Sequence, residues 1–458
     1  MPNLNNNVGS DTNHRQNVPD LNNHYSIEMK YYIIAGEASG DLHGSNLMKG
    51  IYAQDPDAQI RFWGGDCMQD VWHMHMKTSC SDSGSKDRDI HLAEEGSDER
   101  QTARCAYAAG SRHNTSGEIR TGLVRHYKEG AVMGFVEVLA KAGRLLKNVD
   151  FCKKDILAWH PDVVILIDYP GFNFKIAEFA HKAGFKVFYY IAPKVWASRE
   201  GRIRKLKKYT DKLYIVFPFE KPYFETKGIN YIYKGNPLVD AVDGSQAMKE
   251  SRDGFLKRTG LEDRPIIAML AGSRKAEIST MMPVLTEFAA RMHAIPQYKD
   301  HQFLIAGAPA RSMEDYSAWM NEENSRYVKV LFGETQSIIR HAEAGVINSG
   351  TASLETALFG TPQVVGYIIN PLTYWLAKKI IKVKYISLGN LIVDRLAFKE
   401  FIQHDCNADA LVKEIRELIE NQDRRTAMLN EYAEIRNLLG GTGASAAVAK
   451  SMIEELKK

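Results

Sequence analysis

The sequence has few cysteines and no long apolar run. Its five cysteines are irregularly spaced and form no Cys-x-x-Cys pair, which predicts reduced thiols rather than a disulfide framework. No apolar stretch approaches the ~18–20 residues of a membrane-spanning helix. Residues 1–28 are polar and rich in asparagine, without an apolar centre, so we expect a disordered leader rather than a secretion signal. These absences indicate a cytoplasmic protein.

The sequence also lacks a large net charge of either sign and a dinucleotide-binding motif. A net charge of +3 from 59 basic and 56 acidic residues gives no reason to expect a nucleic-acid partner. The first apolar strand is not followed by Gly-x-Gly-x-x-Gly with an acid ~20 residues later, which disfavours an oxidoreductase. The composition, 44% hydrophobic and 25% charged over 458 residues, is typical of a globular protein with two large or three smaller domains.

Short apolar runs alternate with helical patterns along most of the chain. The run Val163–Ile167 is apolar throughout, as in a parallel strand that is buried on both faces. We therefore expect two doubly wound α/β domains, at residues 29–240 and 241–406, followed by helices at 407–458. The expected strands are Tyr31–Ala35, Ile60–Trp63, Val163–Ile167, Lys186–Ile191 and Lys212–Val216 in the first domain, and Ile266–Leu270, Gln302–Ala306, Val328–Leu331, Ala344–Ile347 and Gln363–Tyr367 in the second.

Residues 72–120 interrupt this alternation. They are polar and lack periodicity, and long loops without structure are uncommon inside compact domains. We expect a disordered insertion there. Its histidines and cysteines match no standard zinc spacing, so we predict no metal site.

The segment Ala344–Pro362 joins an apolar strand to a helix through the turn Asn348-Ser349-Gly350. We expect Thr351 to be the helix N-cap. Backbone N–H groups and the positive end of the helix dipole would then point at one place, which is typical of a phosphate site. Glu355 lies one turn further on, within reach of the hydroxyls of an attached sugar. An ordinary capped helix is the alternative.

A second strand-turn-helix segment follows Ile266–Leu270. Its turn contains Gly272, Ser273 and Arg274, and a guanidinium fork suits the oxygens of a diphosphate. Two such segments in one half of the chain favour nucleotide binding, although a solvated arginine is the alternative for Arg274.

A series of motifs resembles one known family from Lys30 to the end of the chain. The motifs are IIAGEASGDLHG (Ile33–Gly44), VMGFVEVL (Val132–Leu139), VVILIDYPGFN (Val163–Asn173), PKVWASREGRIRKL (Pro193–Leu206), FPFEKPYF (Phe217–Phe224), GNPLVD (Gly235–Asp240), AGSRKAEI (Ala271–Ile278), SGTASLE (Ser349–Glu355) and TYWLAKKIIKVKYISLGNLI (Thr373–Ile392). In this order they resemble the lipid-A-disaccharide synthases, which are family-19 glycosyltransferases. The resemblance implies a GT-B fold, in which two Rossmann-like domains face a cleft and the C-terminal helices pack back on the first domain.

The resemblance also implies a reaction. UDP-2,3-diacylglucosamine would donate its sugar to 2,3-diacylglucosamine 1-phosphate (lipid X), giving a β-1,6-linked disaccharide 1-phosphate and UDP. No metal or other cofactor is expected, and the enzyme would sit peripherally on the cytoplasmic face of the inner membrane. A homodimer is left open. The alternatives are another GT-B enzyme, such as the undecaprenyl-linked N-acetylglucosaminyl transferase or a UDP-sugar 2-epimerase, and a nucleotide-binding relic without activity.

Site residues carry over from the family by position. Asp168 is the candidate base at the end of a strand, and Glu37 and Asp41 could fill the same role or orient the acceptor; turn-capping and helix-start electrostatics are their structural alternatives. The expected UDP-sugar residues are Gly272, Ser273, Arg274, Ser349, Gly350, Thr351, Glu355 and Asn390. The expected acceptor residues are Ser39, Gly40, Met133, Asn173 and Trp196. The helical stripe of Met133–Asn148 could meet acyl chains or the membrane surface, or face the core.

Overall fold

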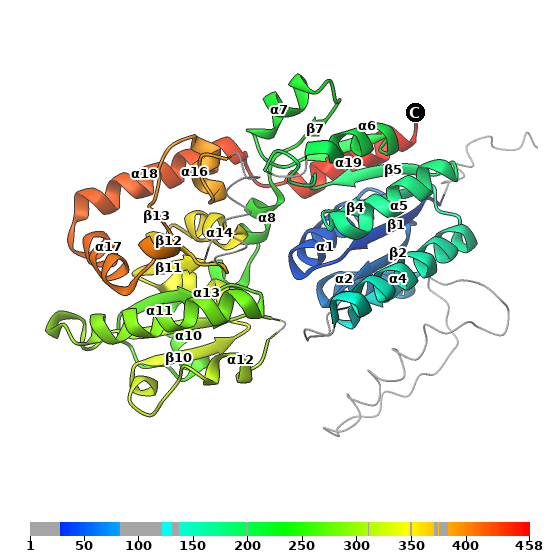
Figure 1. The fold of residues 1–458 in the computed structure, drawn as a ribbon. Helices are drawn as coiled ribbons and strands as arrows, with labels where there is room; N and C mark the ends of the chain where they lie inside the picture. The colour runs from blue at the N-terminus through cyan, green and yellow to red at the C-terminus, as the bar shows by residue number, and fades with distance from the viewer. Residues whose placement is uncertain are drawn as a thin grey trace, which may run out of the picture.

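Two parallel sheets form two lobes in the computed structural model, which describes residues 28–82, 121–130, 137–197, 200–309, 311–348, 350–370, 374 and 383–458 (Figure 1). The first sheet has the strand order β3 (Gly122–His126), β2 (Gln59–Gly64), β1 (Lys30–Ala35), β4 (Val163–Ile167), β5 (Lys186–Tyr190), β6 (Lys212–Ile215), β7 (Ile232–Tyr233). The second has the order β10 (Val328–Phe332), β9 (Gln302–Gly307), β8 (Ile266–Leu270), β11 (Ala344–Asn348), β12 (Gln363–Tyr367), β13 (Glu400–Ile402).

All pairings in both sheets are parallel, so the carboxyl ends of the strands in each sheet share one edge. The central strands β4, β8 and β11 are buried along their whole length, because helices cover both faces of a doubly wound sheet. The ten strands expected from apolar runs are present with ends that differ by at most one residue. Three were not expected, β3, β7 and β13, which hold at most two consecutive apolar residues and are outermost strands of their sheets.

Helices of the first lobe are α1 (Ala38–Tyr52), α2 (Asp66–Asp82), α4 (Glu137–Trp159), α5 (Pro170–Lys182), α6 (Ile203–Tyr209) and α7 (Glu220–Thr226). The connector contains α8 (Pro237–Asp243), α9 (Gln246–Lys249) and α10 (Arg252–Thr259). The second lobe and C-terminal region contain α11 (Lys275–His293), α12 (Glu314–Ser317), α13 (Thr335–His341), α14 (Thr351–Phe359), α16 (Leu388–Val393), α17 (Ala408–Glu420), α18 (Gln422–Leu439) and α19 (Ala444–Leu456).

The expected loop at residues 72–120 is wrong for its first part, because α2 continues to Asp82. Aromatic contacts explain this extension: the ring of His75 stacks on Tyr52 of α1 with 3.6 Å between centroids. The indole of Trp72 lies against Gly122 at the start of β3. Polar composition hid this packing, since only one side of the helix meets the lobe. Residues 83–120 lie outside the described part of the chain, as does the leader up to residue 27.

The two lobes meet around α8, which packs against α1, α14 and α19. The last helix, α19, crosses back to the first lobe and lies along α1, whereas α17 and α18 pack on the second lobe (Figure 1). Asp240 of α8 caps α19 by accepting hydrogen bonds from the backbone N–H groups of Gly443 and Ser445. The helices that open at the two predicted sites, α1 and α14, are thereby brought to one junction.

Candidate active site

The turn after β4 is strained and tightly held. Asp168 and Tyr169 both have left-handed backbone conformations, with φ of 42° and 46°, which are unfavourable for residues other than glycine. The Asp168 carbonyl accepts hydrogen bonds from the Tyr189 hydroxyl at 2.7 Å and from Asn173 Nδ2 at 2.8 Å. The Asp168 N–H donates to the carbonyl of Tyr190 at 3.2 Å. Two consecutive strained residues fixed by neighbours on β5 and α5 are characteristic of a functional turn.

The environment of Asp168 favours a proton acceptor of raised basicity. Burial raises the pKa of this carboxyl and the nearby Glu37 raises it further, while the ammonium of Lys194 opposes both. A base with a pKa moved toward neutrality takes up a proton more readily in a transition state. The arrangement suits Asp168 to general base chemistry.

The turn after β1 lies directly against the Asp168 turn. A Cβ atom added to Gly36 would lie 2.2 Å from the Tyr169 ring, so only glycine permits this approach. Glu37 follows it as the exposed N-cap residue of α1, beside the exposed Ser39 and the buried Gly40. Sequence reasoning did not single out Gly36 or Tyr169, although both stand in the quoted motifs.

Asp41 is bonded into the fold rather than aimed at a ligand. It is 2% exposed, and its carboxylate accepts three backbone N–H groups, from Gly65 at 2.7 Å, Cys67 at 3.0 Å and Met68 at 3.1 Å. These donors form the start of α2, so Asp41 acts as a cap from another helix. Of the three candidate acids, Asp168 and Glu37 lie together, whereas the carboxylate of Asp41 is already bonded to backbone N–H groups.

The predicted acceptor residues have different surroundings. Asn173 is fully buried, with Nδ2 bonded to the carbonyls of Ile167 and Asp168, so it shapes the Asp168 turn. Trp196 is half-buried on the loop after β5, at the same sheet edge. Met133 lies outside the described residues.

In the second lobe, the turn after β8 is hydrogen-bonded to the helix that follows it, α11. Gly272 has a φ of 108°, and Glu277 Oε2 accepts hydrogen bonds from the N–H groups of Ser273 at 3.0 Å and Arg274 at 3.2 Å. The side chain of Arg274 is 71% exposed and touches Glu277 Oε1 at 3.3 Å. The turn therefore already holds one carboxylate, and its arginine is free to reach a second anion.

The turn after β11 opens α14 differently from our expectation. Gly350, not Thr351, is the N-cap, with a φ of 151°, a conformation that Thr would adopt only with strain. Thr351 is the first helical residue and is exposed. In this part of the described chain no side chain caps the helix, so its first N–H groups point at the surroundings. Ser349 is not among the described residues.

Two polar side chains connect these turns to the rest of the lobe. Asn348 donates from Nδ2 to the carbonyl of Ala271 at 3.0 Å, which ties the β11 turn to the β8 turn. Glu355 accepts a 2.7 Å hydrogen bond from Gln336, and burial raises the pKa of its carboxyl. The uncapped end of α14, Arg274 and Glu355 are described residues to which the UDP-sugar prediction refers.

Asn390 serves the interior of the second lobe. It has no exposed surface, its Nδ2 donates to the Phe398 carbonyl and to Glu400 Oε1, and its Oδ1 accepts the N–H groups of Ala397 and Phe398. All its bonding capacity is directed at the 397–400 segment. A direct contact with a nucleotide would require this network to open.

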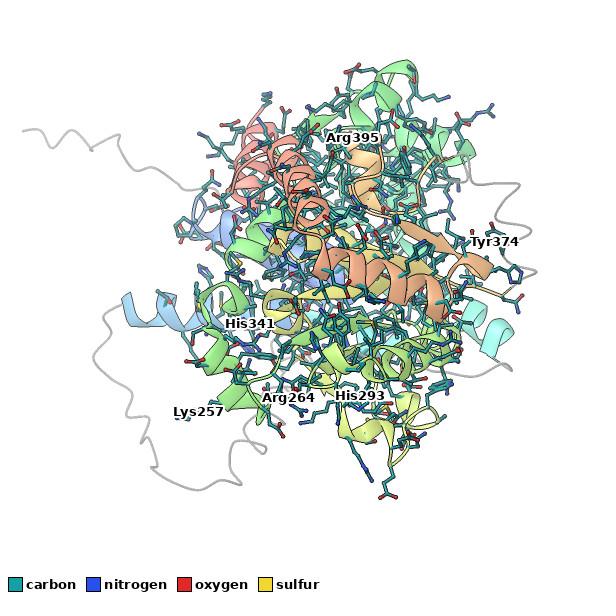
Figure 2. All side chains as sticks on the ribbon, turned by 90° about the vertical axis from the view of Figure 1, so that its left-hand side faces the viewer. Lys257, Arg264, His293, His341, Tyr374 and Arg395 are labelled. Atoms are coloured by element: carbon teal, nitrogen blue, oxygen red, sulfur yellow. The ribbon has the colours of Figure 1, made fainter. Side chains whose placement is uncertain are left out.

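A pocket lies at the opposite edge of the second sheet. It has a volume of ≈ 330 Å³ and lies where β8 and β11 begin, between Arg252, Arg264, His341 and Glu343. Figure 2 labels two of these residues, Arg264 and His341. Arg252 is committed to protein acceptors there, donating to the carbonyls of His341 and Arg264. Ligands of doubly wound sheets bind at the other edge, so we do not assign the pocket to the active site.

Two parallel Rossmann-like sheets, each with helix-opening turns at its carboxyl edge, and a last helix that returns to the first lobe define the GT-B fold. Solved structures agree on the fold. The UDP-GlcNAc 2-epimerase from Methanocaldococcus jannaschii superposes with a TM-score of 0.56 at 13% identity, covering 93% of this chain and 100% of that one. The UDP-GlcNAc 2-epimerase from Neisseria meningitidis has a TM-score of 0.54 at 11% identity, covering 93% and 100%.

Sequence comparison identifies the family within this class. The model of the lipid-A-disaccharide synthetase family matches residues 83–452. The lipid-A-disaccharide synthase of Syntrophus aciditrophicus is 33% identical, covering 93% of this chain and 97% of that protein, and that of Trichlorobacter lovleyi is 32% identical, covering 92% and 97%. The chain therefore belongs to the lipid-A-disaccharide synthase family, whose members are glycosyltransferases of lipid A biosynthesis. None of the helices that the structure describes meets the length and apolarity required to cross a bilayer.

Proposed function

We propose that this enzyme transfers 2,3-diacylglucosamine from UDP to the 6-hydroxyl of lipid X, with the Asp168 carboxylate as general base. The observation that carries the proposal is the position of Asp168: a strained turn at the carboxyl edge of the first sheet, fixed by Tyr189 and Asn173 and adjacent to Glu37. A group held this firmly can be placed within reach of one hydroxyl.

In this reaction the proton and the leaving group move on opposite sides of the donor sugar. Asp168 removes the proton of the acceptor hydroxyl, whose oxygen attacks the anomeric carbon as the bond to the UDP oxygen breaks, so the configuration inverts. A positioned base of this kind contributes about 10²–10⁴-fold to the rate. Glu37 has its own exposed place beside the base, where it can orient the acceptor.

The second lobe supports the leaving UDP. The uncapped end of α14 offers N–H donors and a positive dipole, and the exposed Arg274 guanidinium can pair with diphosphate oxygens. Glu355 is placed one turn into α14, where a ribose hydroxyl would meet its carboxylate. The epimerase from Neisseria meningitidis that shares this fold is described as bound to UDP-GlcNAc, which supports a UDP-sugar as the donor class.

The test is turnover of lipid X with UDP-2,3-diacylglucosamine in detergent, with EDTA present, followed by the configuration of the new bond. We expect a β-linked disaccharide 1-phosphate and UDP in equal amounts. A second protein that lacks residues 83–120 tests whether this segment obstructs the acceptor. The deletion has these ends because α2 ends at Asp82 and described structure resumes at residue 121, just before β3. UDP binding without product from either protein would contradict the transferase proposal and favour the relic.

We also propose that the first lobe meets the membrane through α4. The outer side of this helix exposes Leu146 and Leu157. The basic residues Lys147 and Lys154 lie between them in the sequence, and Lys154 pairs with Asp150 at 3.0 Å. Apolar residues among cations are typical of helices that lie on an anionic bilayer. Flotation with phosphatidylglycerol vesicles should carry the wild type upward and leave a Leu146→Glu, Leu157→Glu double variant behind. Sedimentation without vesicles would test the homodimer that the sequence leaves open.

A further inference from the structure

Glu220 is a buried acid at the carboxyl edge of the first sheet that the proposed reaction does not use. It begins α7, is 1% exposed, and belongs to the FPFEKPYF motif. Its Oε2 accepts the N–H groups of Val216 at 3.1 Å and Phe217 at 3.0 Å, at the end of β6. Its Oε1 accepts the indole N–H of Trp196 at 3.0 Å. One carboxylate therefore joins the turn after β6 to the turn after β5.

A hydrogen bond and a ring contact fix the orientation of the Trp196 indole. Its N–H is bonded to Glu220, and its ring meets Phe219 edge-on, with 4.9 Å between centroids and 86° between planes. Phe219 in turn stacks on Phe217 at 5.3 Å. The indole is only half-buried, so part of a rigid aromatic ring is presented at the edge that carries Asp168. Such a ring is suited to stack on the apolar face of a sugar.

Charges around Glu220 connect it to the base. The ammonium of Lys194, on the loop after β5, lowers the pKa of both Glu220 and Asp168. Burial raises the pKa of the Tyr233 phenol of β7, and the Glu220 carboxylate raises it further. Burial outweighs the donors and raises the pKa of Glu220 to about 7, so its charge, and the strength of its bond to Trp196, would change near neutral pH.

We propose that Glu220 is a positioning residue for the acceptor: it holds the Trp196 indole in the orientation that stacks on the acceptor sugar. The inference rests on the proposed function, because it assigns Trp196 to the acceptor. Glu220 touches no reacting atom and acts through Trp196. Loss of its carboxylate frees the indole to rotate about its side-chain bonds, which weakens acceptor binding and leaves the donor site of the second lobe intact.

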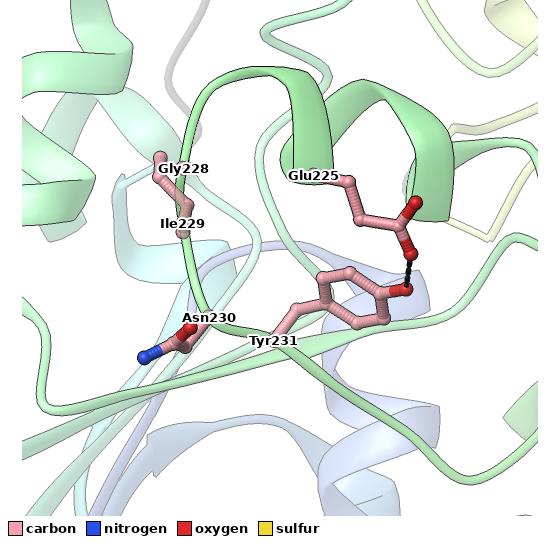
Figure 3. Close-up of a pocket in the computed structure, with 5 residues that line it drawn as sticks. All are labelled: Glu225, Gly228, Ile229, Asn230 and Tyr231. Atoms are coloured by element: carbon pink, nitrogen blue, oxygen red, sulfur yellow. Dashed lines mark hydrogen bonds between the residues drawn. The ribbon is translucent and has the colours of Figure 1, made fainter.

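The test combines kinetics with the fluorescence of Trp196, using Glu220→Gln, Trp196→Phe and the control Glu225→Gln. Glu225 lies on the same helix, but its carboxylate points to the Tyr231 hydroxyl on the outer side (Figure 3). Emission of wild type minus that of Trp196→Phe isolates this indole among the six tryptophans of the chain, and the same subtraction is made in each Glu variant.

We expect Glu220→Gln to raise the KM for lipid X about tenfold, with kcat and the KM for the UDP-sugar changed less than about threefold; tenfold in affinity corresponds to about 1.4 kcal/mol. Trp196→Phe should give the same rise. Acrylamide should quench Trp196 more strongly in Glu220→Gln, and the pH transition of its emission near 7 should vanish there and persist in Glu225→Gln.

Unchanged quenching and an unchanged acceptor KM in a folded Glu220→Gln protein would overturn the proposal. If this variant does not fold, Trp196→Phe decides, because Glu220 and its backbone contacts stay in place: a wild-type acceptor KM there would also overturn it. The fluorescence needs no turnover. If the wild type makes no disaccharide but the pH transition is lost in Glu220→Gln, the fluorescence would still support the positioning of Trp196 by Glu220. Only the proposed reaction would then be contradicted.

Discussion

Helices α1 and α14 pack against the connector helix α8 from the two lobes but begin differently. Each follows an interior strand of a parallel sheet. In α1 the acid of the first turn, Asp41, is bonded to three N–H groups of α2. Neither helix has a side-chain cap, because Glu37 and Gly350 stand at the N-cap positions without such a bond, but the first turn of α14 contains no acid. The first lobe therefore uses its helix-start acid for architecture. In the proposed reaction its base comes from another turn, and the acid-free start of α14 is the end that meets the anion.

The largest expected effect comes from Asp168→Asn. Asparagine tolerates the left-handed backbone conformation at this position as aspartate does, so the turn should survive while the base is lost. We expect kcat to fall about 10²–10⁴-fold with little change in the affinity for UDP, measured by disaccharide formation and by calorimetry.

Glu37→Gln is the matched control, because this acid is adjacent and exposed. A small loss there beside a large loss in Asp168→Asn would sharpen the contrast between the turns. The reverse ranking would move the base to the start of α1.

Asp41→Asn should damage stability rather than chemistry. The amide keeps one acceptor oxygen where the carboxylate serves three donors, so buried N–H groups at the start of α2 lose a partner. We expect the free energy of unfolding in urea to fall by about 1–3 kcal/mol, with kcat of the folded fraction close to wild type. A stable Asp41→Asn enzyme with a large loss in kcat would show that α1 does carry the chemistry.

Arg274→Ala should weaken UDP binding about tenfold, since a charge-assisted hydrogen bond contributes about 1.5–3 kcal/mol and part of this is lost to solvent at an exposed site. Lys275→Ala is the matched control: the neighbouring cation is similarly exposed but reaches Asp315 at 3.7 Å. Calorimetric titration with UDP compares the two. Equal losses would mean that general positive charge, rather than the Arg274 fork, serves the leaving diphosphate.

Much of this architecture could be predicted from local patterns. Runs such as Val163–Ile167 and Ile266–Leu270 are apolar throughout because they are buried on both faces, and their ends coincide with the observed strands. Because the ends of these strands were predicted correctly, the motifs that follow them also put Asp168 and Arg274 in the turns after buried strands. Parallel order then brings those ends to one edge of each sheet.

What stayed hidden depends on partners far away in the chain. Asp41 is a cap only because α2 arrives beside it, and Asn390 is occupied because residues 397–400 fold over it. Glu220 bonds to a tryptophan 24 positions earlier. At the start of α14 the pattern favoured Thr351 as the cap, but the turn required a positive φ and the preceding glycine took that place. Neither composition nor spacing reports such long-range contacts.

The smallest effect concerns the buried side of α1, where His43 lies against the α8 junction. The imidazole is 8% exposed, and its Nδ1 has no hydrogen-bond partner among the residues that the structure describes. Burial lowers its pKa to about 4, against an opposing effect of Asp240. Between about pH 6.5 and 4 the unfolded chain binds a proton that the folded chain does not, so the folded state loses stability as the pH falls through this window, by on the order of 1–2 kcal/mol at pH 5. His43→Gln should remove this slope from urea unfolding measured at pH 7 and pH 5. An unchanged pH dependence of the free energy of unfolding would mean that His43 is solvated and has an ordinary pKa. It would contradict the burial of this side of α1 against α8.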